Sequence, residues 1–521
     1  MANLARHLFE QAQRQPDKIA LIDAGRRHSF GQLCDRVSAA AGGLRAAGFA
    51  PGDRLGLMLS SRVEFIVLQQ AAFALGGVVS PLNIHYRRNE IEHALQSCDL
   101  DYLVIEGNFI ERLPADMATR CPAMRRIIVL DPLAPPDDAQ MLPAAAVLAG
   151  APIAFPVDMP DISLGLMLST SATTGKAKGV MLSIGNIQSN YDATPGWLGL
   201  TGDDTILCAL PLYNTFGLNQ CINATLLLGG TMVLLPRFEV GAVLDAIEAF
   251  RPTFLPAVPA MLQRLLSDPA TPGRDLSSIR RILVGAAPVP GPLLARLRVA
   301  MGGDVVVMQG YGLTEATAIV TILHVETDAD GQLIRPRSVG RALPGIEMMI
   351  ADDALRPVAH GVVGEICVRG PNVMQGYYRQ AAATAEAIVD GWLRTGDLGT
   401  LDADGHYSVV DRKKDVIIRG GQNIYPADIE EVLYSHPAVA EVAVVAAPDE
   451  ALGEVAVAYV ALRAGAQVDV AALRELCQQE LAYYKVPRQI ILLDELPKGP
   501  TGKILRRALR ERLHDGTGTP P

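Results

Sequence analysis

The sequence lacks the features that mark disulfide-rich, metal-clustered or membrane-spanning proteins. Its seven cysteines are scattered, odd in number and never spaced Cys-x-x-Cys, which fits free thiols in a reducing compartment and gives no metal framework. Residues 1–18 are polar and lack the apolar core of a signal peptide. The most apolar stretch, residues 65–82, is broken by glutamine, glycine and proline, so it predicts a buried helix and strand rather than a membrane span. We therefore expect a cytoplasmic protein.

An excess of positive charge is also missing. The chain has 46 lysine and arginine residues against 56 aspartate and glutamate residues, a formal net charge of −10. This balance argues against a nucleic-acid-binding surface but is compatible with a local basic pocket. With 521 residues, 49% hydrophobic and 20% charged, the composition is that of a globular enzyme built from several subdomains.

Helical and strand-like patterns alternate over most of the chain. Helical spacing at residues 33–47, 63–75 and 89–97 is separated by short apolar runs, and further apolar runs between 206 and 308 nearly all end in proline or glycine. This alternation predicts a largely parallel α/β sheet whose loops at the carboxyl ends of strands bind ligands. Residues 131–160, rich in proline, alanine and aspartate, predict a surface connection.

The pattern changes at about residue 338, where shorter alternating strands with turn signals predict an antiparallel β subdomain. A dense charge cluster at 411–415 precedes a small α/β pattern. The fold class that we expect is therefore α/β. We expect a large N-terminal domain (residues 1–411, with α/β subdomains to about 337 and the β subdomain from 338) and a small mobile α+β C-terminal domain (residues 412–521).

Residues 168–182, LSTSATTGKAKGVML, are the most informative stretch. A buried-strand pattern leads into a cluster of hydroxyl residues, glycines and lysines. Glycines let the backbone point its N–H groups at one anion, while hydroxyls add donors and lysine adds charge. The stretch indicates a polyphosphate-binding loop; the alternative is an ordinary polar loop between a strand and a helix. It is not a Walker loop, because Ala177 follows Gly175-Lys176 and Thr170 stands where the first glycine belongs.

This stretch resembles the phosphate-binding signature of the adenylate-forming superfamily, Thr-Ser-Gly-Thr-Thr-Gly-x-Pro-Lys-Gly, which is found in acyl-CoA synthetases, adenylation domains and beetle luciferases. Two positions depart from it, since Ala172 replaces a glycine and Ala177 replaces the proline. Ala172 matters more, because a Cβ is strained wherever a loop needs a positive φ. The resemblance implies that the phosphates of ATP or AMP contact Thr170, Ser171, Thr173, Thr174, Gly175 and Lys178.

Residues 310–315, GYGLTE, match the superfamily's Tyr-Gly-x-Thr-Glu motif. The match implies that Tyr311 offers an aromatic face to adenine, that Gly312 belongs to the same nucleotide site, and that Thr314 binds the α-phosphate. It also implies that Glu315 holds Mg²⁺, an ion that one or two carboxylates and substrate phosphates can bind. Taken alone, a Thr-Glu pair would more often mark a helix N-terminus, with threonine as the cap.

Two loops that follow strands are similar to the parts of the family that surround the acyl group. Residues 211–217, PLYNTFG, carry asparagine where the family often has histidine; a capping asparagine in a turn is the alternative. Residues 285–289, GAAPV, match the loop that packs on adenine. The implied residues are Asn214, Phe216 and Gly217 for the acyl and CoA passage, and Gly285, Ala286 and Ala287 for the nucleotide.

Later motifs resemble the part of the family that binds ribose and turns between the two reaction steps. The resemblance implies that Asp397, at the end of Trp-Leu-Arg-Thr-Gly-Asp, accepts hydrogen bonds from the ribose hydroxyls. It implies that Arg412 contacts ribose or phosphates, that Lys414 is the hinge, and that Gly420 and Gly421 line the pantetheine tunnel. Without the family match, the charge run would be a solvated face.

The motif Pro-Lys-Gly-Pro-Thr-Gly-Lys ends at Lys503. The resemblance implies that Lys503, and not Lys498, reaches the carboxylate oxygen and the α-phosphate, where positive charge stabilises the developing pentavalent phosphorus. The implied catalytic residues are Lys178, Thr314, Glu315 and Lys503, acting with ATP, Mg²⁺ and CoA.

The expected function is an ATP-dependent ligase that forms an acyl-AMP and then an acyl-CoA from a medium-chain or long-chain fatty acid or an aromatic acid. Its pocket residues are expected around Tyr213–Leu218, Val258–Met261, Gly285–Ala287 and Tyr311–Ala316, which are mostly apolar or small. One alternative is an acyl-AMP ligase that loads the phosphopantetheine of an acyl carrier protein. Others are a luciferase and a non-catalytic nucleotide sensor. The oligomeric state stays open between monomer and homodimer.

Overall fold

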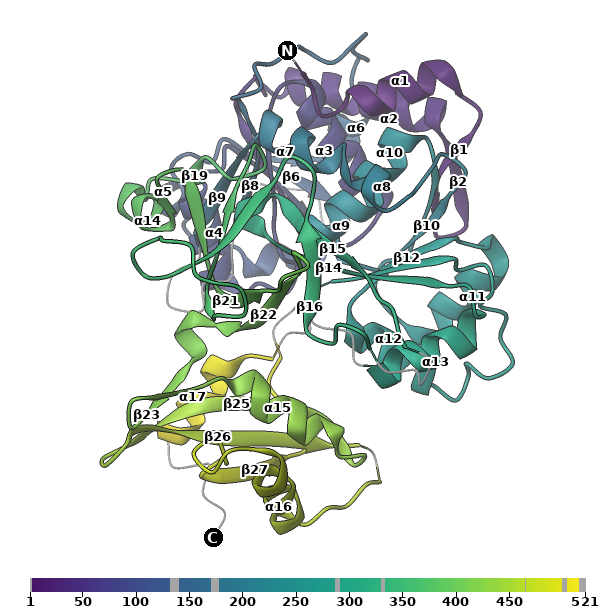
Figure 1. Cartoon of the computed structure of the whole chain (residues 1–521). Helices are drawn as coiled ribbons and strands as arrows, with labels where there is room; N and C mark the ends of the chain where they lie inside the picture. The colour runs from purple at the N-terminus through teal and green to yellow at the C-terminus, as the bar shows by residue number, and fades with distance from the viewer. Residues whose placement is uncertain are drawn as a thin grey trace. The chain divides into compact units, whose positions relative to one another are not determined.

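The computed structural model describes residues 2–131, 140–169, 178–285, 291–328, 333–463, 465–498 and 504–514. The chain divides into two compact units. Unit 1 comprises Met1–Met348 and Val368–Leu393, and unit 2 comprises Met349–Cys367 and Arg394–Pro521. The purple, blue and teal elements of Figure 1 belong to unit 1, and the yellow elements belong to unit 2. Within the described ranges, no helix combines the length and hydrophobicity needed to cross a membrane.

The first sheet of unit 1 has the strand order β19-β9-β8-β4-β3-β5-β6-β7. The strands from β8 to β7 pair in parallel, whereas β9 runs antiparallel to both β8 and β19. Its central strands are buried almost throughout, as parallel strands covered on both faces are. The strands are β3 (Arg54–Met58), β4 (Val78–Pro81), β5 (Tyr102–Glu106), β6 (Arg126–Leu130), β7 (Met141–Pro143), β8 (Leu164–Ser169), β9 (Gly179–Ser183) and β19 (Gly376–Tyr377).

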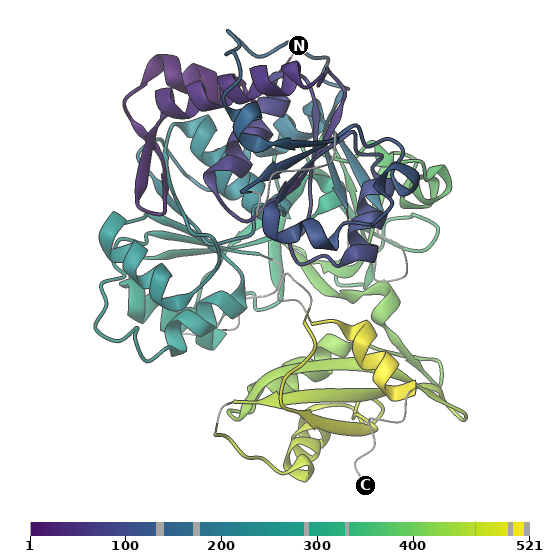
Figure 2. The ribbon, with the colours of Figure 1, turned by 180° about the vertical axis from the view of Figure 1, so that it is seen from behind.

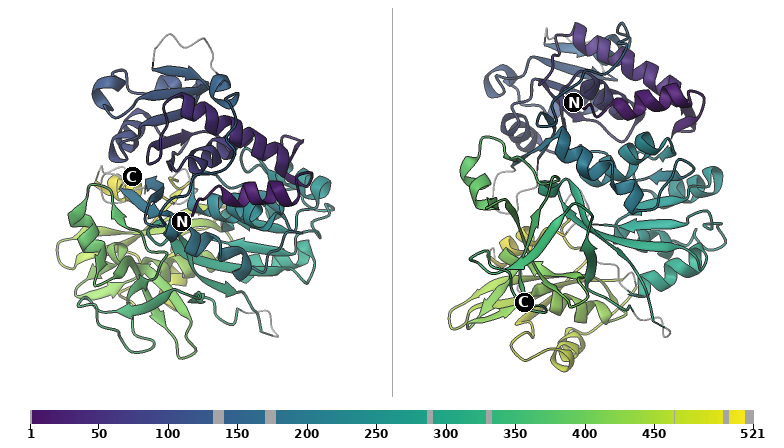
Figure 3. Two further views of the ribbon diagram at one scale, coloured as in Figure 1. Left: turned by 90° about the horizontal axis from the view of Figure 1, so that it is seen from above. Right: turned by 45° about the horizontal axis from the view of Figure 1, so that its top comes forward.

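Helices cover this sheet. Apolar side chains of α4 (Arg88–Ser97), η1 (Gly107–Arg112) and α5 (Met117–Arg120) pack into one core with β3, β5 and β6, and Figure 2 shows these dark blue elements beside the strands. Elsewhere α2 (Phe30–Ala46) packs on α1 (Arg6–Arg14), on α3 (Val63–Ala74) and on α6 (Ala144–Leu148). The helices of the N-terminal segment are the purple ones in the right-hand view of Figure 3. Ser29 and Gln32 form a capping box at the start of α2.

The second sheet of unit 1 contains the order β16-β15-β14-β13-β12-β10-β11-β1-β2. The strands from β14 to β1 pair in parallel, whereas β14, β15 and β16 pair antiparallel, as do β1 and β2. Leucine, isoleucine and valine side chains of α11 (Val240–Phe250), α12 (Pro259–Ser267) and α13 (Gly291–Met301) share one core with these strands (Figure 1). The strands are β1 (Ile19–Asp23), β2 (Arg26–Ser29), β10 (Thr205–Cys208), β11 (Thr231–Leu234), β12 (Phe254–Ala257), β13 (Arg281–Val284), β14 (Val306–Leu313), β15 (Ala318–His324) and β16 (Ser338–Ala342).

The remaining elements of unit 1 lie between the strands along the chain. They include a short π-helix, η2, which is a rare conformation that often marks functional sites. They are α7 (Ile184–Tyr191), α8 (Thr194–Trp197), α9 (Thr215–Gly217), η2 (Leu218–Asn223), α10 (Ala224–Leu228), η3 (Thr314–Ala316), α14 (Ala381–Ala387) and β20 (Ile388–Val389).

Unit 2 is an α+β structure. Its sheet has the order β24-β23-β26-β25, with β27 parallel to β26. Helices α15 and α16 pack in one core of this sheet, and α17 packs in another. The elements that lie in this unit or border it are β17 (Glu347–Ala351), β18 (Gly364–Arg369), β21 (Trp392–Leu401), β22 (Tyr407–Arg412), η4 (Lys413–Asp415), β23 (Ile417–Arg419), β24 (Gln422–Ile424), α15 (Pro426–Ser435), β25 (Val439–Asp449), β26 (Gly453–Leu462), α16 (Val470–Glu480), β27 (Gln489–Leu493) and α17 (Arg506–His514).

The expected α/β fold class is confirmed, and two local predictions are wrong. Residues 131–160 are not only a surface connection, because β7 pairs with β6 and the side chains of Ala144 and Val147 in α6 are buried. The alternative interpretation of the glycine-rich stretch, a polar loop between a strand and a helix, is also wrong, because the element that follows the stretch is the strand β9. Pairing with β8 leaves Val180 and Leu182 fully buried, so tertiary contact overrides the local pattern there.

Candidate active site

The glycine-rich stretch connects two antiparallel strands. Ser169 at the end of β8 pairs with Gly179 at the start of β9, so the two ends of the stretch lie side by side. The predicted phosphate contacts Thr170, Ser171, Thr173, Thr174 and Gly175 lie outside the described residues. Lys178, which directly precedes β9, is described and half-buried.

Tyr377 joins two of the predicted catalytic residues. The Lys178 ammonium lies over the Tyr377 ring, 4.5 Å from its centroid, a distance at which cation–π attraction operates. The Tyr377 hydroxyl donates a hydrogen bond to Glu315 Oε1 at 3.1 Å. Burial, reinforced by the nearby Glu315 carboxylate, raises the pKa of Tyr377, so the hydroxyl remains a donor. The structure therefore brings Lys178 and Glu315 to the same aromatic side chain.

The motif that contains Glu315 forms a tight turn between strands. Thr314 and Glu315 lie in the 3₁₀ turn η3, which connects the antiparallel strands β14 and β15. The alternative of a helix N-terminus capped by Thr314 is therefore wrong. Two residues after the motif have positive φ without being glycine, Thr317 at 59° and Ala318 at 107°; strained backbone of this kind concentrates at functional sites.

Gly312 is required by this turn. A Cβ added to Gly312 would lie 1.5 Å from the carbonyl oxygen of Ala318, at a register shift between β14 and β15. By contrast, a Cβ on Gly310 in the same strand would have 3.5 Å to its nearest neighbour. Tyr311 lies between these glycines and is half-buried, so part of its ring surface is exposed.

The predicted acyl-site residues Asn214, Phe216 and Gly217 lie at and in the short helix α9. Asn214 occupies the N-cap position of α9, but its side chain makes no capping hydrogen bond, so the capping alternative is wrong. The Phe216 ring packs on Gly285 after β13, where an added Cβ would meet ring carbons at 3.1 Å. Gly217 permits close approach of the Pro211 carbonyl oxygen, 2.5 Å from where its Cβ would be. The neighbouring Ala286 and Ala287 lie outside the described residues.

In unit 2, Asp397 and Arg412 are ion-paired. They face each other across β21 and β22, and Arg412 Nε lies 2.6 Å from Asp397 Oδ1. The Asp397 side chain is 6% exposed and the Arg412 side chain 50%. The structure thus presents a buried carboxylate and an exposed guanidinium as one pair, which sequence reasoning treated separately.

The charge cluster 411–415 is not a uniformly solvated face, because its two acidic residues are buried. The Asp411 carboxylate accepts a hydrogen bond from the Ala427 amide at 2.9 Å, and burial raises the pKa of Asp411. Asp415 accepts from Arg510 at 2.6 Å. Lys413 instead pairs with Asp353 at 2.7 Å and Glu365 at 3.2 Å. The ion-pair partners thus differ between Lys413 and Asp415, on either side of Lys414, which is exposed.

Gly420 and Gly421 form the two-residue turn of the hairpin between β23 and β24. Arg419 pairs with Gln422, and the two glycines have φ values of +55° and +82°. Positive φ at both turn residues is the requirement of a type I′ turn, which explains the glycine pair locally. Both glycines are exposed at the tip of the hairpin.

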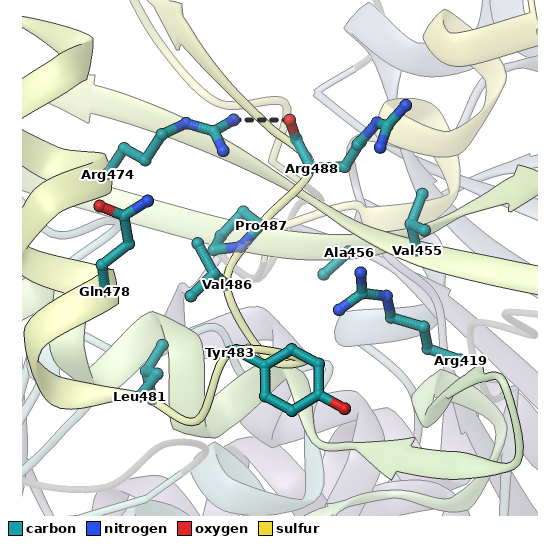
Figure 4. Close-up of a pocket in the computed structure, with 10 residues that line it drawn as sticks. All are labelled: Arg419, Val455, Ala456, Arg474, Gln478, Leu481, Tyr483, Val486, Pro487 and Arg488. Carbon is teal, nitrogen blue, oxygen red and sulfur yellow. Dashed lines mark hydrogen bonds between the residues drawn. The ribbon is translucent and has the colours of Figure 1, made fainter. Parts of the chain in front are cut away.

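A pocket of about 380 Å³ opens in unit 2 beside this hairpin (Figure 4). Three arginines line it, and no acidic residue does. Two of them are fixed by backbone oxygens: Arg419 donates to Tyr484 at 2.6 Å and Arg474 to Arg488 at 2.6 Å. Tyr483, 80% exposed, lies at its edge. The lining residues are Arg419, Val455, Ala456, Arg474, Gln478, Leu481, Tyr483, Val486, Pro487 and Arg488.

Lys498 and Ile504 form a short antiparallel bridge. Lys503 itself lies outside the described residues. The Lys498 ammonium forms an ion pair with Glu441 at 2.7 Å. This structural role agrees with the expectation that Lys498 is not the catalytic lysine.

The residues of the site fit a magnesium ion only if the substrate supplies further ligand atoms. In the described ranges, no group of three or more His, Cys, Asp or Glu side chains could hold a metal. Glu315 Oε1 accepts a hydrogen bond from the Tyr377 hydroxyl. Among the described residues, Oε2 has no hydrogen-bond partner. One carboxylate oxygen together with phosphate oxygens suits Mg²⁺, which keeps several non-protein ligands.

Comparison with known proteins identifies the family. The model of the AMP-binding enzyme family matches residues 8–378, and the model of the AMP-binding enzyme C-terminal domain matches residues 428–503. The chain belongs to the AMP-binding enzyme family. The resemblance to adenylate-forming enzymes is thereby confirmed.

Relatives of this AMP-binding enzyme are CoA ligases. It is 36% identical over 508 residues to a feruloyl-CoA synthase of an Amycolatopsis species, covering 96% of this chain and 97% of the relative. It is 36% identical over 511 residues to an indoleacetate–CoA ligase of Aromatoleum aromaticum, covering 98% of each. The o-succinylbenzoate CoA synthetase of Bacillus subtilis, solved with ATP and magnesium ion, has a TM-score of 0.84 and 33% identity over 98% of this chain and 99% of that one.

These findings establish the reaction class. The AMP-binding enzyme is an acid–thiol ligase that uses ATP, Mg²⁺ and CoA and forms an acyl-adenylate. Sequence reasoning had not found Tyr377 or the three arginines of the pocket. The only sequence signal for Tyr377 is its place after Gly376, and the arginines lie too far apart in the chain to form a motif.

Proposed function

We propose that this enzyme joins a ring-bearing carboxylic acid to CoA, with the residues placed above in the following roles. The observation that carries the proposal is the arrangement in which the Tyr377 ring holds Lys178 and the Tyr377 hydroxyl orients Glu315. This arrangement supports a site in which Lys178 would contact the ATP phosphates and Glu315 would hold the metal ion. Both groups act by stabilising negative charge on phosphorus.

In the first step the substrate carboxylate attacks the α-phosphorus of ATP, and pyrophosphate leaves. Lys178 and residues 170–175 hold the phosphates, Thr314 donates to the α-phosphate, and Glu315 holds Mg²⁺. Asp397 accepts from the ribose while paired with Arg412. Lys503 neutralises charge at the reacting oxygen. Tyr311 and the 285–287 loop, including Ala286 and Ala287, enclose the adenine.

In the second step the CoA thiol attacks the acyl carbon, the thiol proton is released and AMP leaves. We propose that Lys414 is the hinge between the steps, which is supported by the different ion-pair partners of Lys413 and Asp415 on either side of that residue. The exposed Gly420-Gly421 turn would then face the pantetheine arm, which passes Asn214 and Gly217. The domain boundary at 411–412 belongs to the same proposal.

We propose that the nucleotide end of CoA binds in the unit 2 pocket. The pocket beside the Gly420-Gly421 turn is lined by three arginines and an exposed tyrosine. Arginine suits phosphate groups and an aromatic ring suits adenine, and CoA carries both at the end remote from its thiol. A carrier-protein phosphopantetheine has no such nucleotide.

The acid that we propose carries a ring. The feruloyl-CoA and indoleacetate relatives, each 36% identical over nearly the whole chain, are named for aromatic acids. The acyl segment also has a phenyl ring, Phe216, packed on Gly285 at its entrance. We place the reaction in the cytoplasm, in keeping with seven free cysteines.

The test is to incubate the enzyme with Mg-ATP, CoA and a panel of aromatic, alicyclic and straight-chain acids, and to identify products by mass spectrometry. Acyl-CoA and AMP from ring-bearing acids are expected. Accumulation of acyl-AMP without thioester would transfer the proposal to a carrier-protein acceptor. Lys503→Ala should lose adenylation far more than thioester formation from supplied acyl-AMP, whereas the matched variant Lys498→Ala should lose neither.

A further inference from the structure

Gln220 is a fully buried amide without partners. Its side chain has no exposed surface, and neither its carbonyl oxygen nor its amide nitrogen has a hydrogen-bond partner within the part of the chain that the structure describes. A buried glutamine normally satisfies both atoms, because leaving them unpaired costs free energy. It lies in the π-helix η2, which directly follows the acyl segment.

The neighbours of Gln220 on this helix identify the direction in which it points. Leu218 and Ile222 line a small cavity with Gln70 and Tyr191. Asn219 donates to Thr194 at 3.1 Å, toward α8. The remaining face is that of Phe216, four residues earlier and therefore about one turn away.

The helix face that Gln220 shares with Phe216 belongs to the expected acyl pocket. The Phe216 ring packs on Gly285, which together with residues 213–218 belongs to the expected acyl pocket. Along the helix, burial increases from half-buried Asn214, Thr215 and Phe216 to fully buried Gly217 and beyond. Gln220 thus lies one turn further along the helix than Phe216, on the same face, and is more fully buried.

We propose that Gln220 is a specificity-determining residue that hydrogen-bonds a polar group at the end of the acid remote from its carboxylate. The inference rests on the proposed function and refines its substrate to ring-bearing acids with a distal hydroxyl, keto or ring N–H group. A glutamine amide has one acceptor and two donor hydrogens, so it can bind each of these groups. An acid with an apolar end would leave the amide unpaired.

The consequence for selectivity is asymmetric. A site built to hydrogen-bond a substrate group rejects the analogue that lacks it, because the polar atoms of the protein then stay buried and unsatisfied. A wholly apolar pocket has no comparable means of discrimination. Gln220 therefore favours the polar member of a pair of acids that otherwise have the same shape.

The experiment measures kcat/KM for matched pairs of acids, 4-hydroxycinnamate against cinnamate and 3-(4-hydroxyphenyl)propanoate against 3-phenylpropanoate. Wild type is expected to prefer the hydroxylated member of at least one pair by about 10-fold or more. Gln220→Met, which keeps the length but removes both polar atoms, should abolish that preference and leave the apolar member within about threefold. Gln220→Leu provides a second variant if the first is poorly folded. Each variant should melt at or above the wild-type temperature without ligand.

Gln70→Met is the matched control. Gln70 is also a buried glutamine with an unpartnered carbonyl oxygen, but it lines the small cavity on the other side of η2. Its replacement should leave the ratio within each pair unchanged. Equal effects of Gln220→Met on both members, or no preference in wild type, would overturn the inference while acyl-CoA formation still supports the proposed function. Absence of acyl-CoA from every acid would overturn both.

Discussion

The hydroxyl of Tyr377 lies 3.1 Å from Glu315 Oε1, although 62 residues separate the two in the chain. Pairing of β19 with β9 places Tyr377 beside Val180, and the β14–β15 turn brings Glu315 to the same place. The hydrogen bond fixes Oε1 of the Glu315 carboxylate. It therefore also sets the direction in which Oε2 points. Tyr377 thus orients the carboxylate that we propose as the magnesium ligand.

Tyr377→Phe keeps the ring below Lys178 but removes the hydrogen bond to Glu315. A hydrogen bond to a charged group stabilises by about 1.5–3 kcal/mol, so we expect pyrophosphate release to fall about 10-fold or more, with a higher Mg²⁺ requirement. In Tyr377→Leu, pyrophosphate release should fall further, because the cation–π contact with Lys178 is lost too. Titration of Mg²⁺ in a pyrophosphate assay checks this. Tyr378→Phe is the control, since the Tyr378 hydroxyl donates to Asp99 at 3.1 Å; a similar loss there would contradict the assignment.

The loss in Tyr377→Phe should not depend on pH. Burial and the Glu315 carboxylate raise the pKa of the folded-state phenol above its ordinary value, so the protonated donor persists throughout pH 6–9, below even the ordinary value near 10. The ratio of wild-type to variant kcat/KM should therefore be constant over this range. A ratio that collapses toward one as pH rises to 9 would show that the phenol ionises and does not act as a donor.

Gly312→Ala should disable adenylation. The new Cβ would overlap the Ala318 carbonyl oxygen, and forcing β14 and β15 apart would displace Thr314 and Glu315 at a cost of about 1–3 kcal/mol or more. We expect pyrophosphate release to fall about 100-fold. Gly310→Ala, in the same strand but with a 3.5 Å clearance, should stay within about threefold. Equal tolerance of both substitutions would contradict the close approach.

Arg488→Gln should weaken the binding of CoA without affecting the binding of ATP. The Arg488 side chain is exposed at the unit 2 pocket and its backbone oxygen accepts from Arg474, so the substitution leaves that contact intact. Loss of one charge-assisted contact to phosphate predicts a KM for CoA about 10-fold higher, with the KM for ATP unchanged. The effect should shrink when pantetheine replaces CoA. Arg507→Gln, which removes a surface pair with Glu511 at 2.8 Å, is the control, and an equal rise there would point to net charge alone.

Local patterns predicted much of this molecule. The βα alternation follows from runs of buried apolar residues such as those of β3 and β5, which a parallel sheet requires on both faces. The positive φ values at Gly420 and Gly421 follow from a two-residue turn. In each case the residues that determine the structure are close together in the sequence or form a regular pattern.

Features that depend on distant pairing could not be predicted in the same way. The strand β9 was not predicted, because its pairing with β8 and with the distant β19 is not visible in the local sequence. The Asp397–Arg412 pair depends on a register that shifts between Leu398 and Gly399. Gln220 has an unremarkable sequence neighbourhood, and only its burial distinguishes it.

The charge cluster at 411–415 responds unevenly to ionic strength. Asp353, which pairs with Lys413, is 90% exposed, whereas the Asp415 side chain that holds Arg510 is 8% exposed. Salt screens exposed pairs strongly and buried pairs much less. Raising the ionic strength therefore weakens the contact between Lys413 and Asp353, while Asp415 stays paired with Arg510 of α17.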